Sequence, residues 1–585
     1  MTESRSGRGR LALATILVFA VVGVFCVRLV DIQLVRADQL NSDSLSKRAI
    51  TTTTYAPRGD IVDSNGVLLA GTVDRFDVTV APLNMQQGFQ RKAADGTKTT
   101  VTVNQIATKI ATATKQDPAV VLSALTKNPT SNYALLAKAV DLPTRRAIVD
   151  LKIPGITFKL HPTRIYPDGS VAGNLVGYMN TEGPGGGLEL GARKCLDSVS
   201  GSATYEQGAD GVQIPGSNVA VKVPNPGGTL KLTIDSYLNW FAQQALAEQG
   251  TAIGAKSATA VVLRIKDFHL MAVADWPSVD PNNINGTPIG NVGSLAFADQ
   301  YEPGSVFKAM SASMLIDTGT ATPATQVVVP SRWVTPEGGV INDATPHPEA
   351  HLTLTGVLQN SSNVGISKLG SQVPEKTRYD YMKKFGLGAA SPVGFLGEAK
   401  GSIQRLPWDS QTHYNVLYGQ GVSATAIQVA QIFGTIGNGG VRLPTTLVQS
   451  CTRPDGTVTD LPSTAGIRVI SDATAKTVAN MLESVVQGGE LSKAVKISGY
   501  RVAGKSGTAE VAGPHGYTGD RVVSFAGIAP ADDPQYVVVV TYTKPATMKS
   551  SAAAAPTFKK IMSQVLTKYR VPPSTTPSTY PAPTW

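Results

Sequence analysis

The longest uninterrupted run of hydrophobic residues lies close to the N-terminus. Leu11 to Val27 has no charged side chain, and as a helix it would span roughly 25 Å. Extending the helix to Val30 brings it near the ~30 Å hydrocarbon core of a bilayer. Three arginines within residues 1–10 predict that this first segment is cytoplasmic and that later residues face outward. We therefore expect a single transmembrane anchor over residues 11–30.

A cleaved signal peptide is the alternative interpretation of this run. Such peptides have a hydrophobic region of about 7–15 residues followed by a small-residue cleavage site. Here the run continues into Cys26, Val27 and Arg28, and Phe25 stands where a lipoprotein signal needs a small residue. An uncleaved anchor is expected, followed by a polar, threonine-rich stalk over residues 31–56.

The spacing of hydrophobic positions beyond the stalk predicts two α+β domains. In residues 57–226, a β-branched run at 77–80 precedes helix-like stretches at 103–114 and 118–125. No catalytic cluster is evident in this first domain. The second domain is expected over residues 227–570.

In the second domain a helical region is bracketed by early and late strand candidates. Asp235 is a candidate N-cap for a helix over 237–246. Strands are expected at 258–265, 501–511, 522–528 and 536–542, and a helix at 558–569. This order favours an antiparallel sheet flanked by helices over alternating βαβ units. Residues 571–585 are rich in Pro, Ser and Thr and are expected to form a disordered tail.

The composition is typical of a folded protein rather than a disordered one. Of 585 residues, 42% are hydrophobic and 16% charged. The net charge of +10 is not gathered into a long basic run, so nucleic acid is not an expected partner. Cys26, Cys195 and Cys451 show no metal-type spacing, and the 347–351 segment reads as a surface turn, so neither metal nor cofactor is expected. Whether Cys195 and Cys451 pair is left open.

Candidate chemistry begins with Glu302-Pro303-Gly304-Ser305-Val306-Phe307-Lys308. Pro and Gly break the chain, and Ser305 then starts a run that can form a helix through Ile316. Ser305 and Lys308 are three apart and share one helical face. A serine needs a base to attack a carbonyl, and a neutral lysine at pH 7 costs about 4–5 kcal/mol. Lys308 must therefore be desolvated or lie beside a second cation.

Two further motifs follow in order. Ser361-Ser362-Asn363 stands on a turn after a helix-like stretch at 354–359, and Lys505-Ser506-Gly507-Thr508 lies within an alternating strand. Lys505 is the expected second cation. Gly507 either lets a substrate backbone approach or clears room for a neighbouring helix. Each motif is weak alone, but the ordered set is the one that the penicillin-binding proteins and β-lactamases carry.

The sequence resembles the class B high-molecular-weight penicillin-binding proteins over nearly its full length. The segments 56–66, 164–167 and 187–189 are similar to the motifs of the family's elongated pedestal, and 232–235, 280–282, 419–421 and 426–428 to those of its transpeptidase domain. The resemblance implies a pedestal over 57–226 and a transpeptidase domain over 227–570. Glu302 and the segment 524–532 resemble the division-specific subgroup, with an elongation-type enzyme as the alternative.

The resemblance also implies the roles of the candidate site residues. Ser305 would attack the D-Ala-D-Ala carbonyl of a peptidoglycan stem peptide, Lys308 would take its proton, and Ser361 would relay protons between Lys308 and Lys505. Asn363 would bind the substrate amide, and the motif of Lys505, with the Ser506 and Thr508 hydroxyls and Gly507, would bind the carboxylate. Backbone N–H groups of Ser305 and Thr508 would form the oxyanion hole.

The implied partners are stem peptides as donor and amine acceptor, β-lactams, the inner membrane, a SEDS-type glycosyltransferase and other division proteins. The implied location is the bacterial cell membrane at the septum, with the catalytic domain outside. A β-lactam hydrolase or sensor and a non-catalytic division scaffold are the competing functions. The acceptor amine, the oligomeric state and the activation mechanism are not evident from the sequence.

Overall fold

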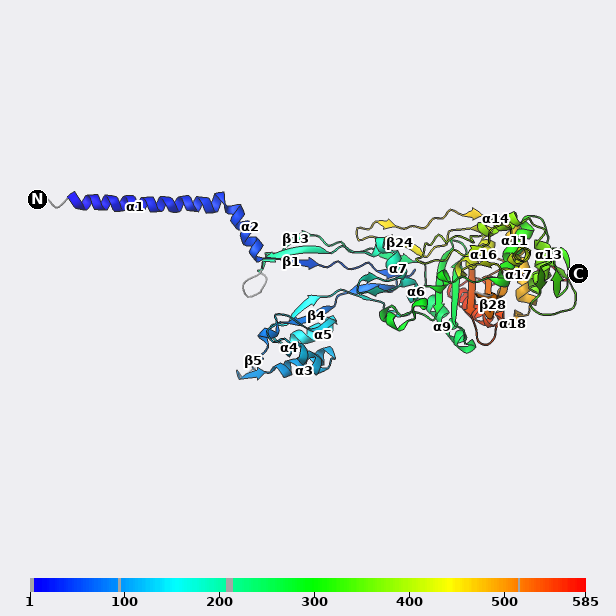
Figure 1. Ribbon diagram of the computed structural model, residues 1–585, viewed down its shortest axis with the longest axis horizontal. Coiled ribbons are helices and arrows are strands. Elements are labelled where there is room, and N and C mark those ends of the chain that lie inside the picture. The colour runs from blue at the N-terminus through cyan, green and yellow to red at the C-terminus, as the bar shows by residue number, and fades with distance from the viewer. Residues whose placement is uncertain (1–4, 93–95, 207–213, 514–515) are drawn as a thin grey trace. The chain divides into compact units, whose positions relative to one another are not determined.

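The computed structural model describes residues 5–92, 96–206, 214–513 and 516–585 (Figure 1). Contacts divide the chain into two compact units, one formed by residues 1–57 and 198–226 and the other by 58–197 and 227–585. These units divide the expected pedestal, residues 57–226, between them. The bounds of the six expected segments remain predictions.

The first unit contains the N-terminal helix and a three-stranded sheet. Helix α1 (Arg5–Val30) continues through a short π-helical segment (Asp31–Val35) and leads to α2 (Ala37–Arg48). The stretch Arg8–Val35 is long and apolar enough to cross a membrane by length and composition. Strand β12 (Gly201–Glu206) pairs with β1 (Ala49–Thr54) and β13 (Val219–Lys222). Residues 1–4 of the predicted cytoplasmic segment lie outside the described residues.

The second unit begins with a small α+β lobe that has its own hydrophobic core. Strand β4 (Phe76–Val80) lies between β7 (Ala134–Val140) and β8 (Thr157–Leu160), and α3 (Val103–Thr114), α4 (Pro118–Thr126) and α5 (Leu142–Asp150) cover them. Helix α3 starts at a capping box in which the Thr102 hydroxyl accepts from the Gln105 N–H. The predicted helices at 103–114 and 118–125 are thus confirmed.

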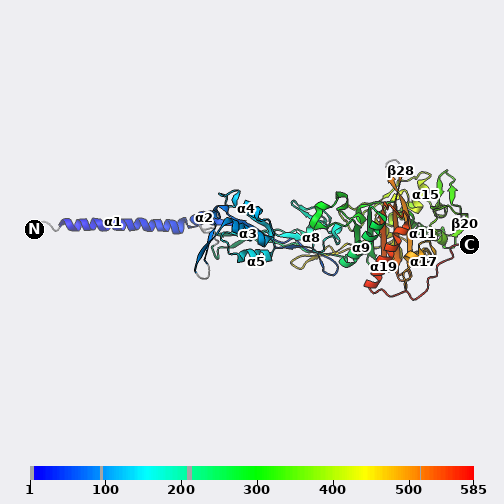
Figure 2. The same ribbon diagram turned by 90° about the horizontal axis from the view of Figure 1, so that it is seen from below.

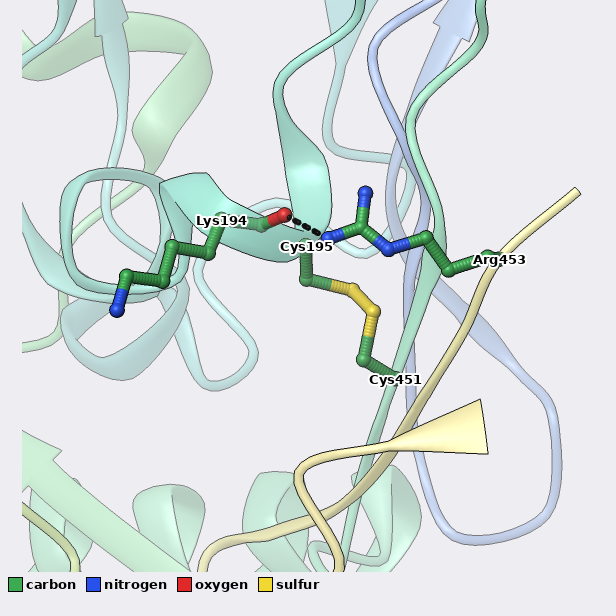
Figure 3. The surroundings of a disulfide bond; sticks show 4 residues. All are labelled: Lys194, Cys195, Cys451 and Arg453. Carbon is green, nitrogen blue, oxygen red and sulfur yellow. Dashed lines mark hydrogen bonds between the residues drawn. A yellow bond between two sulfur atoms is a disulfide. The ribbon is translucent and has the colours of Figure 1, made fainter. Parts of the chain in front are cut away.

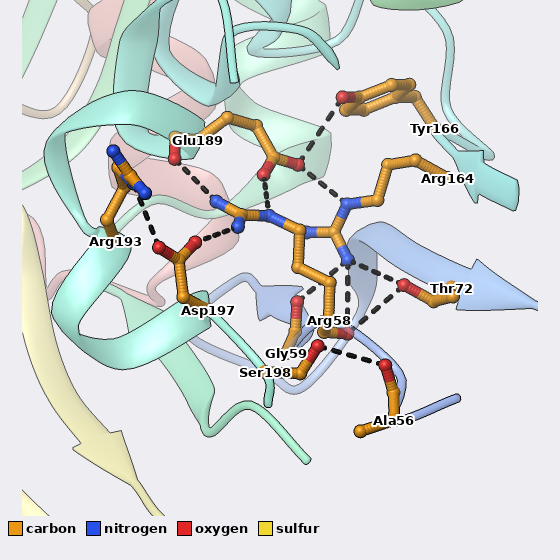
Figure 4. A network of polar contacts seen from close by, with 10 residues as sticks. All are labelled: Ala56, Arg58, Gly59, Thr72, Arg164, Tyr166, Glu189, Arg193, Asp197 and Ser198. Carbon is orange, nitrogen blue, oxygen red and sulfur yellow. Dashed lines mark hydrogen bonds and ion pairs between the residues drawn. The ribbon is translucent and has the colours of Figure 1, made fainter. Parts of the chain in front are cut away.

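The three pedestal-type motifs meet in a buried ion cluster (Figure 4). Glu189 is fully buried and accepts from Arg58 Nε at 2.6 Å and from Arg164 Nε at 2.7 Å. Arg58 also bonds to Asp197. Because a buried charge without partners is costly, this carboxylate is stable only with both guanidinium groups in place. Segments far apart in the sequence are thereby fixed to one another.

A six-stranded sheet of order β25-β24-β14-β2-β3-β9 follows this cluster, and it includes β25 (Val458–Thr459), β3 (Leu68–Val73) and β9 (Thr163–Ile165). Strand β14 (Thr229–Leu232) lies between β24 (Val448–Thr452), to which it is antiparallel, and β2 (Ile61–Val62), to which it is parallel. Cys195, at the end of α8 (Arg193–Leu196), forms a disulfide with Cys451 of β24 (Figure 3). The pairing that the sequence left open is therefore made in the structure.

Removing this disulfide should destabilise the second unit. The bond closes a loop between residues 256 positions apart, and cross-links of long loops stabilise proteins by about 2–4 kcal/mol. The double variant Cys195→Ser/Cys451→Ser is expected to have a free energy of unfolding that is lower by that amount. It should therefore unfold at a lower denaturant concentration. Cys26→Ser, at a free and exposed cysteine, is the control and should leave the unfolding curve unchanged. Equal curves for both variants would contradict a stabilising role.

A five-stranded antiparallel sheet of order β16-β15-β29-β28-β27 forms the centre of the remaining chain. Its strands are β15 (Ser257–Arg264), β16 (His269–Trp276), β27 (Ala503–Gly513), β28 (Gly516–Ala529) and β29 (Tyr536–Thr543). Helices α9 (Ser236–Ile253) and α19 (Ala555–Lys568) pack on one face. Helices α11 (Lys308–Asp317), α16 (Ala426–Gly437) and α17 (Asp472–Gly488) pack on the other. This confirms the α+β class and the antiparallel sheet flanked by helices.

The local predictions for this sheet and its helices are confirmed in type, although α9 continues to Ile253, seven residues beyond the predicted end at 246. The Asp235 carboxylate accepts from the Leu238 N–H as the N-cap of α9. Three of the four expected strands begin within two residues of their predicted starts. Strand β28 begins at Gly516, earlier than residue 522, because β27 and β28 extend as a hairpin that the apolar pattern does not mark.

The C-terminal segment differs from the expected disordered tail. Residues 571–585 leave α19 and run along the molecule to end beside β20 (Ala350–Thr353) (Figure 2). The Ser574 N–H donates to the Gly499 carbonyl at 2.9 Å, and Thr584 forms an antiparallel bridge with Leu352. Composition did not reveal these contacts because they use backbone groups of distant segments.

Candidate active site

Ser305 lies in a tight 3₁₀ turn (Gly304–Phe307) that leads directly into α11. Gly304 has φ +57°, and a Cβ on it would stand 2.9 Å from the Thr508 carbonyl oxygen. This glycine therefore lets the serine turn pack closely against β27. The strand that carries Lys505 thus lies beside the start of the Ser305 helix.

Lys308 is fully buried, and four oxygen atoms surround its Nζ. The Ser361 carbonyl and Asn363 Oδ1 lie at 2.6 Å, Ser305 Oγ at 2.8 Å and Ser361 Oγ at 3.4 Å. The Asn363 orientation is fixed because its Nδ2 donates to the Asn342 carbonyl at 3.0 Å.

These partners determine how a neutral Lys308 amine would be oriented. A neutral amine has two N–H groups and one lone pair. The Ser361 carbonyl and Asn363 Oδ1 can only accept hydrogen bonds, so they take both N–H groups. The lone pair is then left for the Ser305 hydroxyl. This is the orientation that a general base for Ser305 requires.

The electrostatic surroundings favour the neutral form of Lys308. Burial lowers the pKa of Lys308 well below its usual value, and the nearby Lys505 cation lowers it further, while Asp343 opposes the shift. Burial also lowers the pKa of Lys505, to about 7. Lys505, the predicted second lysine, thus acts on the pKa of Lys308 as expected. Desolvation nevertheless has the larger effect on Lys308.

Ser361 bridges the two lysines. Its Oγ accepts from Lys505 Nζ at 2.9 Å and lies 3.4 Å from Lys308 Nζ. The residue has φ +58°, a backbone conformation that non-glycine residues rarely adopt and that occurs at functional sites. Ser362 follows as the N-cap of α13 (Asn363–Gly370), its hydroxyl accepting from the Gly365 N–H.

The third motif lies on β27, at the edge of the five-stranded sheet. Ser506 Oγ lies 3.3 Å from Lys505 Nζ, and Thr508 Oγ1 accepts from the Ser551 N–H at 3.2 Å. A Cβ on Gly507 would meet Ser524 Oγ at 2.4 Å and the Pro303 carbonyl oxygen at 3.0 Å. Of its two predicted roles, the structure supports clearing room for the neighbouring serine turn.

A cavity of about 890 Å³ opens over these residues. Ser305, Ser361, Asn363, Ser506 and Thr508 line it, and the side chains of Lys308 and Lys505 are buried behind them. All eight predicted site residues are therefore gathered at one site. No group of three or more metal-ligating side chains occurs among the residues that the structure describes.

Asp343 belongs to the same site but was missed from the sequence. Its carboxylate accepts from Ser362 Oγ at 2.8 Å and from the Val364 N–H at 2.9 Å, and it pairs with His347 Nε2 at 3.0 Å. It thus orients the start of α13, which carries Asn363. No motif marks it, because it stands 18 residues before Ser361 and the intervening chain forms β20 and α12.

A serine hydroxyl bonded to a buried lysine, placed against the edge strand of an antiparallel sheet that has helices on both faces, defines the class of penicillin-recognising serine acyltransferases. Comparisons with known proteins agree with this class. Residues 258–563 match the penicillin-binding protein transpeptidase domain, and residues 53–232 match the penicillin-binding protein dimerisation domain.

The similar proteins extend over most of the chain. Penicillin-binding protein PbpB of Mycolicibacterium smegmatis is 36% identical, covering 98% of this chain and 91% of that protein. Peptidoglycan D,D-transpeptidase FtsI of Escherichia coli K12 is 32% identical over 76% of this chain and 74% of its own. The aztreonam complex of penicillin-binding protein 3 from Mycobacterium tuberculosis matches with a TM-score of 0.68 and 28% identity, over 91% and 100% of the two chains. This chain belongs to the class B penicillin-binding proteins, in the group that contains PbpB and FtsI.

Proposed function

We propose that this chain is a membrane-anchored peptidoglycan D,D-transpeptidase of the division septum, with Ser305 as nucleophile. One observation carries the assignment. The Lys308 amine has both N–H groups committed to oxygen acceptors, and its remaining position faces Ser305 Oγ at 2.8 Å. The relatives named as D,D-transpeptidases supply the substrate class.

In the first half-reaction Ser305 Oγ attacks the carbonyl carbon between two D-alanines, and its proton passes to Lys308. The backbone N–H groups of Ser305 and Thr508 stabilise the oxyanion, and each such donor is worth about 10²–10³ in rate. The C–N bond then breaks, and Ser361 passes a proton from Lys308 to the leaving D-alanine amine. Its contacts with both lysines suit this relay.

The substrate is held by groups on both sides of the serine. Ser506 and Thr508, with the Lys505 cation behind them, bind the terminal carboxylate. Asn363 binds the amide of the stem peptide, which extends along the edge strand β27. In the second half-reaction the amine of another stem attacks the acyl-enzyme, and Ser305 leaves with the proton from that amine. β-Lactams acylate Ser305 in the same way.

The charge pattern around the N-terminal helix supports a location of this site outside the cell. Helix α1 spans the inner membrane, and the arginines before its apolar run keep the N-terminus in the cytoplasm. The similarity to FtsI supports the septum as the location. A SEDS-type glycosyltransferase and other division proteins are the proposed membrane partners. A fluorescent fusion should form a septal band, and a lateral pattern would contradict the division role.

Mapping the site of acylation tests the catalytic proposal. Full-length protein in detergent is incubated with benzylpenicillin, digested and examined by mass spectrometry, and the adduct is expected on Ser305. An adduct on another residue would reject the mechanism. The lifetime of the adduct separates the competing functions, because a transpeptidase should hold it for many minutes and a hydrolase should release it in seconds.

The pH dependence of acylation follows from the pKa of Lys505, which burial lowers to about 7. A lysine is charged below its pKa, so attraction for the penicillin carboxylate is present at pH 6 and is lost as the pH rises through 7. The second-order acylation rate should therefore fall between pH 7 and 9, by up to about tenfold per unit. Stopped-flow measurements with a fluorescent penicillin would show this.

Lys505→Arg is the matched variant for the pH measurement, because a guanidinium stays charged over this range. Its absolute rate is expected to be lower, but its alkaline decline should disappear. A wild-type rate that kept rising to pH 9 would show that the Lys505 charge does not hold the carboxylate.

A further inference from the structure

The C-terminal segment 571–585 contacts the chain just before β27 on one side of the catalytic cavity and β20 on the other. One wall is formed by β27, which carries Lys505, and the other by β20 and the chain that leads to Ser361. The segment follows α19 and ends beside β20 (Figure 2). It therefore crosses from the sheet side of the site to the helical side.

The first attachment lies just before β27. The Tyr500 hydroxyl donates to the Val571 carbonyl at 2.7 Å, and the Arg501 N–H donates to Ser574 Oγ at 3.0 Å. The Arg501 guanidinium bonds to Thr576 Oγ1 at 2.9 Å and also to the buried Glu483 of α17. Arg501 stands four residues before Lys505, so this attachment is at the base of the catalytic strand.

The second attachment lies on β20, immediately before α12 (Leu354–Gln359). The Thr353 N–H donates to the Pro583 carbonyl at 3.0 Å, and Thr353 Oγ1 donates to the Ala582 carbonyl at 2.7 Å. Trp585 Nε1 donates to the Leu352 carbonyl at 3.2 Å. Ala350 and Leu352 line the cavity, and α12 ends directly before the turn that carries Ser361.

The link between the two attachments is rich in proline. Residues 577–583 contain Pro577, Pro581 and Pro583, and proline-rich segments favour an extended, semi-rigid backbone. Such a link has a nearly fixed reach of roughly 3 Å per residue. A flexible tail would tether the walls without setting the distance between them, whereas this link resists both lengthening and shortening.

We propose that residues 571–585 form a strap that positions the Ser361 wall against the Lys505 strand, with Pro583 and Trp585 as its positioning residues. The strap touches no reacting atom. It acts through Ser361, whose hydroxyl must reach both lysines. The inference rests on the proposed transpeptidase function and adds to it a segment that the three sequence motifs do not include.

Gly356 of α12 offers a way to displace the strap without removing it. A Cβ on this residue would lie 1.8 Å from the Pro583 carbonyl oxygen, which no small adjustment relieves. In an ordinary helix, replacing glycine by alanine is stabilising. Gly356→Ala is therefore expected to damage the site only when Pro583 is present.

The test combines this substitution with deletion of residues 577–585 in the full-length, membrane-anchored protein. Each change alone should lower the acylation rate constant for a fluorescent penicillin by about tenfold, since sub-ångström misplacement of a catalytic group has effects of this size. The initial binding constant should change less, because Ser361 acts in proton transfer. In the deleted protein, Gly356→Ala should have no further effect.

Two controls separate positioning from general damage to the fold. Gly191→Ala adds a methyl group that meets nothing within 4 Å and should leave acylation unchanged. A synthetic peptide of residues 577–585, added to the deleted protein, should restore acylation in a saturable way, and a scrambled peptide should not.

Two results would overturn the strap proposal. Wild-type acylation rates in both the deleted protein and Gly356→Ala would overturn the strap while leaving Ser305 acylation, and so the proposed function, intact. An equal loss from Gly356→Ala in both backgrounds would assign the effect to α12 itself and would also overturn it.

Discussion

Replacing Ser305 by alanine should abolish covalent labelling by penicillin while leaving the fold and reversible ligand binding intact. The variant removes the only atom that can form the acyl-enzyme, and loss of a catalytic serine lowers rates by roughly 10⁶-fold in other serine enzymes. Fluorescent penicillin, followed by denaturing electrophoresis, gives the measurement. Thermal unfolding of the same sample would show that the protein is folded.

Ser313→Ala is the matched control for Ser305→Ala. Ser313 lies on α11, the helix that follows the Ser305 turn; it is buried and donates to the Ala309 carbonyl at 2.8 Å. Its replacement should leave labelling at the wild-type level. Persistent labelling of the Ser305 variant, at a rate near that of the control, would reject Ser305 as the nucleophile.

Lys308→Met should lower the acylation rate by about 10²–10⁴, the contribution of a positioned general base, and should also make the protein more stable. Keeping a buried lysine neutral at pH 7 costs about 4–5 kcal/mol relative to water. Methionine loses three hydrogen bonds worth about 1 kcal/mol each. The expected net gain is about 1–2 kcal/mol in the free energy of unfolding.

The stability gain of Lys308→Met should depend on pH with a definite sign. Since burial lowers the pKa of Lys308 in the folded state, the unfolded wild type binds more protons, and its stability rises with pH up to about 10. The methionine variant lacks this proton uptake. Its advantage should therefore be larger at pH 7 than at pH 10, and an advantage that grew with pH would contradict a neutral buried lysine.

The sequence predicted those parts of the site whose residue types are dictated by chemistry. A lysine that must be neutral needs desolvation or a second cation, and this requirement together with the motif order predicted Lys505, while the family resemblance implied the role of Ser361. The apolar runs at 258–265 and 536–542 predicted the strands that support them. The pattern of apolar residues and the chemical requirements of the site together identified the core of the catalytic domain.

The features that were missed depend on contacts that leave no local pattern. Asp343 lies in an irregular stretch, and its function is defined by groups of α13 that only the fold brings near. Residues 571–585 are held by backbone and side-chain bonds to distant segments, so a composition that suggests disorder is compatible with a fixed path. The Cys195–Cys451 bond depends on the adjacency of α8 and β24, which arises only from the completed six-stranded sheet.

That disulfide also limits where the chain can mature. Disulfide bonds persist in oxidising compartments and are rare in the reducing cytosol. In the proposed orientation, a chain that leaves the ribosome with both thiols free can close this bond only after its catalytic part has crossed the membrane. The protein therefore acquires its full stability at the location where its substrate is found, and cells that lack an oxidising envelope pathway should accumulate a more protease-sensitive form.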